Sequence, residues 1–116
     1  MKKKEMTLAE LKILVKKFEK KFSNKVDFRL EPKFSPDLEY DGIGWDEMFL
    51  APEPKLAALI GSVSDDDGMD IVTIAIDSTN NVYFSIANEE GTQGEIVGPI
   101  SKFNTLFEHA IEIAQG

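Results

Sequence analysis

The 116-residue chain contains no cysteine, a single histidine and a single tryptophan. Without cysteine there can be no disulfide, thiolate metal site or cysteine nucleophile, and this composition fits a reducing cytoplasm. No apolar run approaches the roughly 18 residues that a membrane-spanning helix needs. The basic start Met1-Lys2-Lys3-Lys4 is not followed by the apolar segment of a signal peptide. We therefore expect a cytoplasmic protein, and the length predicts one domain over residues 1–116.

Motifs of common enzyme chemistry are also missing. The sequence has no HExxH, GxSxG, P-loop or GxGxxG pattern. The only histidine, His109, is expected on the exposed flank of a helix, and Gly42-Ile43-Gly44 has no third glycine to form a phosphate loop. Carboxylates are numerous enough for a glycosidase-like pair, but such a pair needs a deep cleft that a chain of this length has little material to build. We expect neither catalysis nor a bound cofactor.

Charge is divided unevenly along the chain. Residues 1–33 carry a net charge of +6 and residues 34–116 carry −14, which together give the overall −8. A field of this asymmetry steers partners by sign. The acidic part should repel nucleic acid and membrane lipid and should favour a basic protein. The alternative is that the acidic surface only keeps the protein soluble.

Two amphipathic helices are predicted, one at each end. Thr7 and Glu10 fit a capping box, and apolar residues then recur at helical spacing as far as residue 22, with lysines around the rest of the circumference. A basic amphipathic helix can lie on membranes or contact phosphates, but the apolar stripe favours a helix docked on a core. The second helix is expected to begin with Ser101 as its N-cap and to bury a stripe that starts at Phe103.

The segment between the helices predicts an antiparallel sheet. Alternating polarity over residues 25–31 is typical of a strand with one wet face. Four further strands are expected over residues 58–63, 69–77, 82–87 and 95–100, joined by short polar connections. The order predicts an α+β fold, in which an antiparallel β-sheet meander is flanked by an N-terminal and a C-terminal helix.

The region between the first strand and the meander, residues 32–57, is irregular and contains four of the five prolines. Within it we expect a short strand around residues 40–45 and a helical turn beginning near Pro54.

Residues 64–70, SDDDGMD, hold four carboxylates. An EF-hand register that puts Gly68 at the sixth position would place Val63 and Ile74 at the first and last ligand positions, where neither can ligate. Aspartate and glycine are turn formers. We therefore predict a turn between two strands, whose acids could also face a partner, and no dedicated metal site.

Residues 40–49, YDGIGWDEMF, combine aromatic side chains and methionine with acids. Tyr, Trp and Met are enriched where proteins bind one another, and acids around an aromatic anchor would match a basic partner. The alternative is that Trp45 and Phe49 cover the open side of the sheet.

Three segments of the second half resemble SUKH-superfamily domains: Ile74-Ala75-Ile76-Asp77, Val82-Tyr83-Phe84, and the start of the last helix, ISKFNTL at residues 100–106. The resemblance covers residues 70–112. The Ser-Lys-Phe of this chain has one residue more than the family's Ser-Phe, and the family's N-terminal Leu-Pro and Asn-Gly signatures are not found. The resemblance implies an immunity protein, a cytoplasmic domain that binds and blocks a toxin, often a nuclease. No catalytic residue is implied.

The sequence therefore predicts a non-enzymatic protein-binding module of the immunity type that neutralises a basic toxin and is a monomer or weak homodimer. Its predicted contact residues are Asp41, Trp45, Asp46, Glu47, Asp65, Asp66 and Asp67. Two alternatives stay open. One is a small ligand-binding or enzymatic domain with a pocket between sheet and helices. The other is a structural or regulatory dimer that pairs through a strand edge at residues 26–30 or 95–100.

Overall fold

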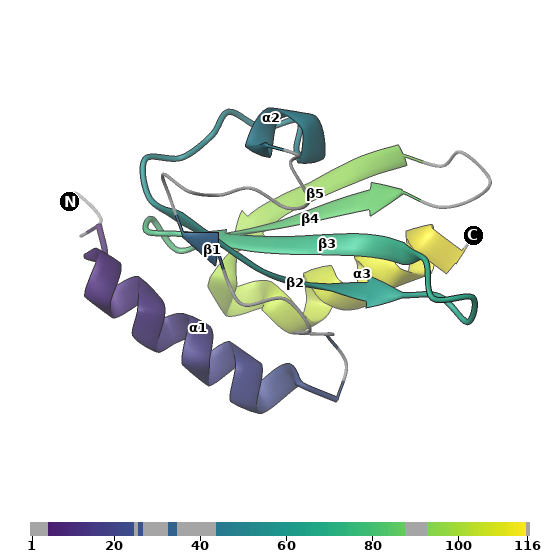
Figure 1. The fold of residues 1–116 in the computed structure, drawn as a ribbon, viewed down its shortest axis with the longest axis horizontal. Helices are drawn as coiled ribbons and strands as arrows, with labels where there is room; N and C mark the ends of the chain where they lie inside the picture. Colours follow the sequence, from purple (N-terminus) through teal and green to yellow (C-terminus); the bar gives the residue numbers. More distant parts are fainter. Residues whose placement is uncertain (1–4, 25, 27–32, 35–43, 88–92, 116) are drawn as a thin grey trace.

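The computed structural model describes residues 5–24, 26, 33–34, 44–87 and 93–115 (Figure 1). The elements follow one another as α1 (Leu8–Phe22), β1 (Lys33–Phe34), α2 (Trp45–Met48), β2 (Ala57–Ser64), β3 (Asp70–Asp77), β4 (Asn81–Ala87), β5 (Gln93–Pro99), the 3₁₀ turn η1 (Ile100–Lys102) and α3 (Phe103–Gln115).

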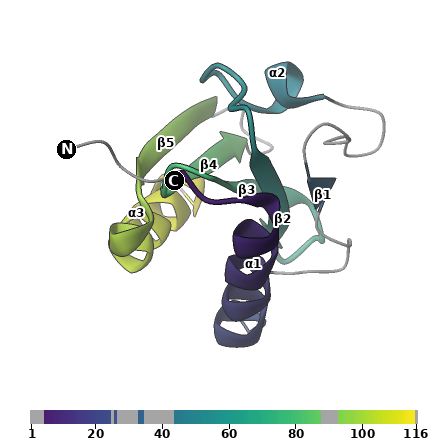
Figure 2. The same ribbon diagram turned by 90° about the vertical axis from the view of Figure 1, so that its left-hand side faces the viewer.

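The strands form one sheet in which each lies beside its neighbour in the chain, in the order β1-β2-β3-β4-β5. Every neighbouring pair is antiparallel. The long helices α1 and α3 lie on one face of this sheet, and the short helix α2 lies on the other (Figures 1 and 2). The predicted α+β meander between two terminal helices is thus confirmed. We call the surface that carries α2 the α2 face; neither long helix covers it.

The two long helices begin differently. In α1 the predicted capping box is present: the Thr7 amide donates to Glu10 Oε1 over 3.1 Å, and the Glu10 amide donates to Thr7 Oγ1 over 3.2 Å. The prediction that Ser101 caps α3 is wrong, because Ser101 lies inside η1, whose N-cap is Pro99. Residues 100–102 already turn helically as they leave β5, so the chain enters α3 without needing a side-chain cap there.

The main core lies between the sheet and the two long helices. Phe84 of β4 is fully buried at its centre, and its ring meets Phe103 of α3 at 5.4 Å between centroids. Phe103 also contacts Phe18 and Phe22 of α1, at 4.8 and 4.5 Å. Aromatic pairs at such separations stabilise beyond the area they bury. These rings join α1 to α3 across the width of the sheet.

Three other predicted elements need comment. The predicted strand at residues 25–31 lies outside the described residues apart from Val26, which is buried. Of the predicted strand at 40–45, only its last two residues are described, and they begin α2 instead. The helical turn near Pro54 is wrong: residues 55–56 form a bend. The next residue already pairs in the sheet, Ala57 with Asp77, so strand pairing overrides the helical tendency there.

A buried carboxylate organises the turn between β3 and β4. Asp77 is only 2% exposed. Its Oδ1 accepts hydrogen bonds from the Thr79 amide at 2.9 Å, the Thr79 hydroxyl at 2.8 Å and the Asn81 amide at 3.0 Å. Its Oδ2 accepts from the Tyr83 hydroxyl at 2.5 Å. Asn80 within this turn has φ 67°, a backbone state that asparagine tolerates. Several hydrogen-bond donors therefore stabilise the Asp77 carboxylate, as a buried polar group requires.

The proton of Tyr83 gives this turn a pH dependence. Burial raises the pKa of Tyr83 above its ordinary value of about 10, and the hydrogen bond to Asp77 and the charges of Asp77 and Glu95 raise it further. The folded state therefore keeps the proton to higher pH than the unfolded state. The contribution of this proton to stability is fully present below about pH 10 and is lost as the pH rises above it.

We expect the free energy of unfolding to fall more steeply above about pH 10 in the native protein than in Tyr83→Phe. Urea denaturation at intervals from pH 8 to pH 11 measures both slopes. The comparison of slopes, not of absolute stabilities, isolates the proton, because Tyr83→Phe also removes a hydrogen bond. Identical slopes in the two proteins would show that the loss of stability above about pH 10 does not come from the Tyr83 proton.

Candidate functional site

The short helix α2 is held on the sheet, at the α2 face, by two aromatic rings. Trp45 and Phe49 are 2% and 3% exposed, and their rings stack at 4.3 Å. Trp45 meets Tyr83 of β4 edge-on at 5.0 Å, and its indole Nε1 donates to the Ala51 carbonyl at 2.8 Å. The structure thus shows the alternative in which these rings cover the sheet. Trp45 positions α2 and does not form part of the surface.

The chain that follows α2 is fastened to the sheet by polar contacts. The carboxylate of Glu95 on β5 accepts from the Leu50 amide at 2.5 Å and from the Ala51 amide at 3.1 Å. The Ser85 hydroxyl on β4 donates to the Met48 carbonyl at 2.6 Å. These contacts fix the backbone while the side chain of Leu50 stays 85% exposed. An apolar side chain displayed on a fixed backbone is preorganised for contact with another molecule.

A hollow of about 400 Å³ lies between α2 and the ends of β4 and β5, and we call it the α2 groove. Its acidic side is formed by Asp46 and Glu47, which are exposed. Its apolar surface includes Met48, Phe49 and Leu50, and none of the described residues that line it is basic. The groove therefore combines apolar surface with an acidic rim, which suits a basic side chain with an apolar stem.

Residues 65–69 form the predicted turn between β2 and β3. Asp65 Oδ1 accepts from the amides of Asp67 and Met69, both at 2.9 Å. Gly68 has φ 81°, a conformation that glycine adopts without strain. The carboxylate of Asp65 is thus occupied in holding the turn, whereas Asp66 and Asp67 are exposed.

The predicted contact residues do not form one patch. Asp46 and Glu47 lie together on α2, at the α2 face, whereas the Asp65–Asp67 turn lies beyond one end of the sheet (Figure 1). Asp41 lies outside the described residues.

Sequence reasoning missed Leu50, Ser85 and Glu95. Leu50 and Glu95 are 45 positions apart, and no local pattern reports a contact over that separation.

Several other kinds of site find no support in the described part of the chain. No three histidine or carboxylate side chains there are grouped to hold a metal ion. His109 is exposed on α3, as expected. Among the described helices, none has both the length and the apolar character required to cross a bilayer.

Comparison with known proteins gives no further guide to function: no family model matches the chain, and no curated protein or solved structure is significantly similar to it.

Proposed function

We propose that this chain is a non-enzymatic protein-binding module whose contact surface is α2 with the α2 groove, and that its partner is a basic protein. The observation that carries the proposal is Leu50, 85% exposed on a backbone fastened by Glu95, next to the exposed acids of α2. Exposed apolar side chains within a polar rim mark protein-interaction sites.

Charge supports the sign of the partner. Residues 34–116 carry −14, and the described residues that line the groove include Asp46 and Glu47 but no lysine or arginine. A cationic surface would be attracted over long range and then held by Leu50 at short range. Because Asp66 and Asp67 lie away from α2, they would contribute to the attraction but not to the final contact.

The resemblance of residues 70–112 to SUKH domains narrows the proposal to an immunity-type protein that neutralises a toxin, such as a nuclease, whose active cleft must be basic to bind nucleic acid. A cytoplasmic setting belongs to the same proposal, since a chain without cysteine depends on no disulfide and suits a reducing compartment.

The test is a pull-down from the native cell at low and at high salt, using the native protein and Asp46→Lys/Glu47→Lys. We expect the native protein to retain a basic protein that the variant loses. For the purified pair, the variant should associate at least about tenfold more slowly at low salt, because it replaces attraction with repulsion. Coexpression with the captured protein should restore growth only when the α2 acids are intact.

The matched control is Asp66→Lys/Asp67→Lys, which makes the same change of charge on the β2–β3 turn. It should slow association moderately and leave dissociation unchanged, whereas Leu50→Ser should speed dissociation without altering charge. The proposal is wrong if no basic protein is retained, or if the α2 and turn variants bind it equally well.

A further inference from the structure

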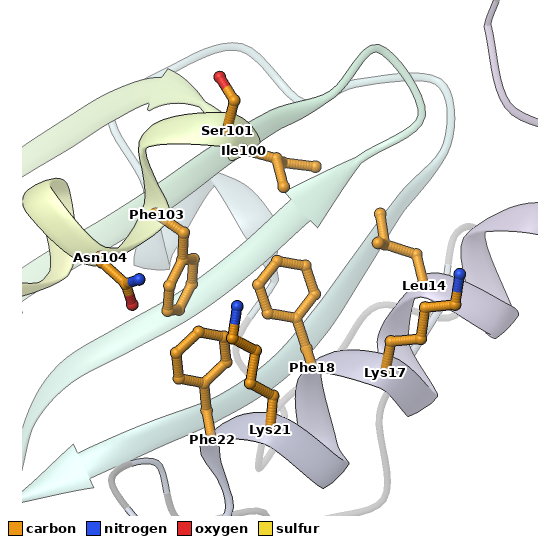
Figure 3. Close-up of a pocket in the computed structure, with 9 residues that line it drawn as sticks. All are labelled: Leu14, Lys17, Phe18, Lys21, Phe22, Ile100, Ser101, Phe103 and Asn104. Carbon is orange, nitrogen blue, oxygen red and sulfur yellow. The ribbon is translucent and has the colours of Figure 1, made fainter.

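A second hollow opens between α1 and α3, on the side of the sheet opposite α2 (Figures 1 and 3). Its volume is about 360 Å³, near the lower end of the range for small-molecule sites. We call it the interhelix pocket. No described residue lines both this pocket and the α2 groove, so what the pocket binds is independent of the function proposed above.

The base of the interhelix pocket is apolar and fixed. Three phenylalanine rings from two helices meet there: Phe18 and Phe22 of α1 and Phe103 of α3. Both α1 rings contact Phe103, at 4.8 and 4.5 Å between centroids. Leu14 and Ile100, each half-buried, extend the apolar surface toward the rim (Figure 3). Because packed neighbours fix the rings, the base is formed before any ligand arrives.

The rim of the interhelix pocket is cationic on one side. Lys17 and Lys21 are four positions apart on α1 and therefore stand on the same side of the helix. The Lys21 ammonium lies 5.3 Å from the centre of the Phe22 ring, over the apolar base. None of the described residues that line the pocket is an aspartate or a glutamate, although the whole chain carries −8. Within the described residues, this pocket thus has the opposite charge to the α2 groove.

The other side of the rim offers polar groups from the end of α3 that meets η1. Ser101 and Asn104 line the pocket there and are exposed. A hydroxyl and a side-chain amide can both donate hydrogen bonds to an anion. An anionic group placed between α1 and α3 would therefore meet ammonium groups on one side and neutral donors on the other.

We propose that the interhelix pocket binds a small amphipathic carboxylate, of the type of a medium-chain fatty acid. The apolar chain would lie on the phenylalanine base, and the carboxylate would bind Lys17 and Lys21. At about 30 Å³ for each water-sized group, 360 Å³ holds about a dozen non-hydrogen atoms. That corresponds to a carboxylate with a chain of about eight to ten carbons.

The lysines of α1 alone do not account for this choice. Lys16 and Lys20 are also exposed, but they do not line the pocket. A polyanion or an anionic membrane would use all four lysines alike. An amphipathic carboxylate would use only the two lysines beside the apolar base, and this difference separates the two outcomes.

The experiment is an NMR titration of the full-length, ¹⁵N-labelled protein with octanoate below its micellar concentration. We expect amide shifts concentrated at the C-terminal half of α1 and around Ile100–Lys102, with a Kd of about 0.1–1 mM for a ligand of this size. Acetate, which has the head group without the chain, and octylammonium, which has the chain with the opposite charge, should not reproduce these shifts.

Two variants with the same loss of charge test the pocket. Lys17→Gln/Lys21→Gln should weaken octanoate binding about tenfold, from a two- to fivefold contribution of each exposed lysine. Lys16→Gln/Lys20→Gln should leave it unchanged. All four lysines are exposed, so neither variant should disturb the fold.

Equal weakening by both variants would overturn the proposal and indicate a diffuse lysine surface. Equal binding of octylammonium, or the absence of localised shifts with octanoate, would overturn it as well. The result does not depend on the partner-binding proposal, because Asp46→Lys/Glu47→Lys leaves the interhelix pocket intact and should bind octanoate as the native protein does.

Discussion

Asp77→Ala is expected to lower the free energy of unfolding by about 3 kcal/mol, the scale found when a buried, hydrogen-bonded charge is removed and its partners are left unpaired. Asp77 is 2% exposed and accepts from Thr79, Asn81 and Tyr83. For a domain of this size the change corresponds to a melting temperature lower by about 12 °C. Urea denaturation followed by circular dichroism, with calorimetry for the melting temperature, measures both quantities.

The reason for so large an effect is that one carboxylate accepts hydrogen bonds from donors on three different residues. In Asp77→Ala the hydroxyl of buried Tyr83 loses its acceptor, and the amides of Thr79 and Asn81 lose theirs at the turn. Asp77→Asn keeps the size and one carbonyl oxygen, but its amide group offers hydrogen atoms where the carboxylate offered lone pairs. Its stability should therefore lie between those of the native protein and Asp77→Ala.

The control for this prediction is Asp66→Ala. It removes the same charge from an exposed position in the β2–β3 turn and should change the free energy of unfolding by less than about 0.5 kcal/mol. If Asp77→Ala were no more destabilising than Asp66→Ala, the donors around Asp77 would have to find water or other acceptors, and the central role of this carboxylate in the turn would be contradicted.

The parts of the fold that the sequence predicts are those that depend on neighbouring residues. The capping box of Thr7 and Glu10 joins positions three apart. The turn at Asp65 closes within four positions. Strands β2 to β5 are each formed by a run of apolar or alternating residues. Each pairs with its neighbour in the chain, so the order of the strands needs no long-range information.

The parts that the sequence does not predict depend on contacts between distant segments. Trp45 and Phe49 lie next to acids, as exposed anchors do, but the sheet beneath them leaves room for two rings, because Ala57 and Ala75 lie there. Glu95 looks like one more acid of an acidic chain until it is seen to hold the Leu50 amide. The interhelix pocket likewise exists only because Phe103 meets the rings of α1.

Trp45→Ala is expected to lower the free energy of unfolding by about 3–4 kcal/mol, as is usual when a buried tryptophan is truncated. The indole stacks on Phe49, meets Tyr83 and donates to Ala51. A helix of four residues is too short to be stable alone, so without the indole α2 should leave the sheet and take Leu50 with it. Urea denaturation gives the loss of stability, and hydrogen exchange at the amides of Leu50 and Ala51 reports the local change.

The structural effect of Trp45→Ala should be confined to the α2 face. The rings that form the interhelix pocket belong to the other core, so octanoate binding should be retained while partner binding is lost. Val97→Ala is the matched control, since Val97 pairs with Tyr83 across the sheet but is 47% exposed, and it should lower stability by less than about 1 kcal/mol. If the amides of Leu50 and Ala51 stay protected in Trp45→Ala, then the polar contacts of Glu95 and Ser85 hold this segment without the indole, and the indole is not what positions the partner-binding surface.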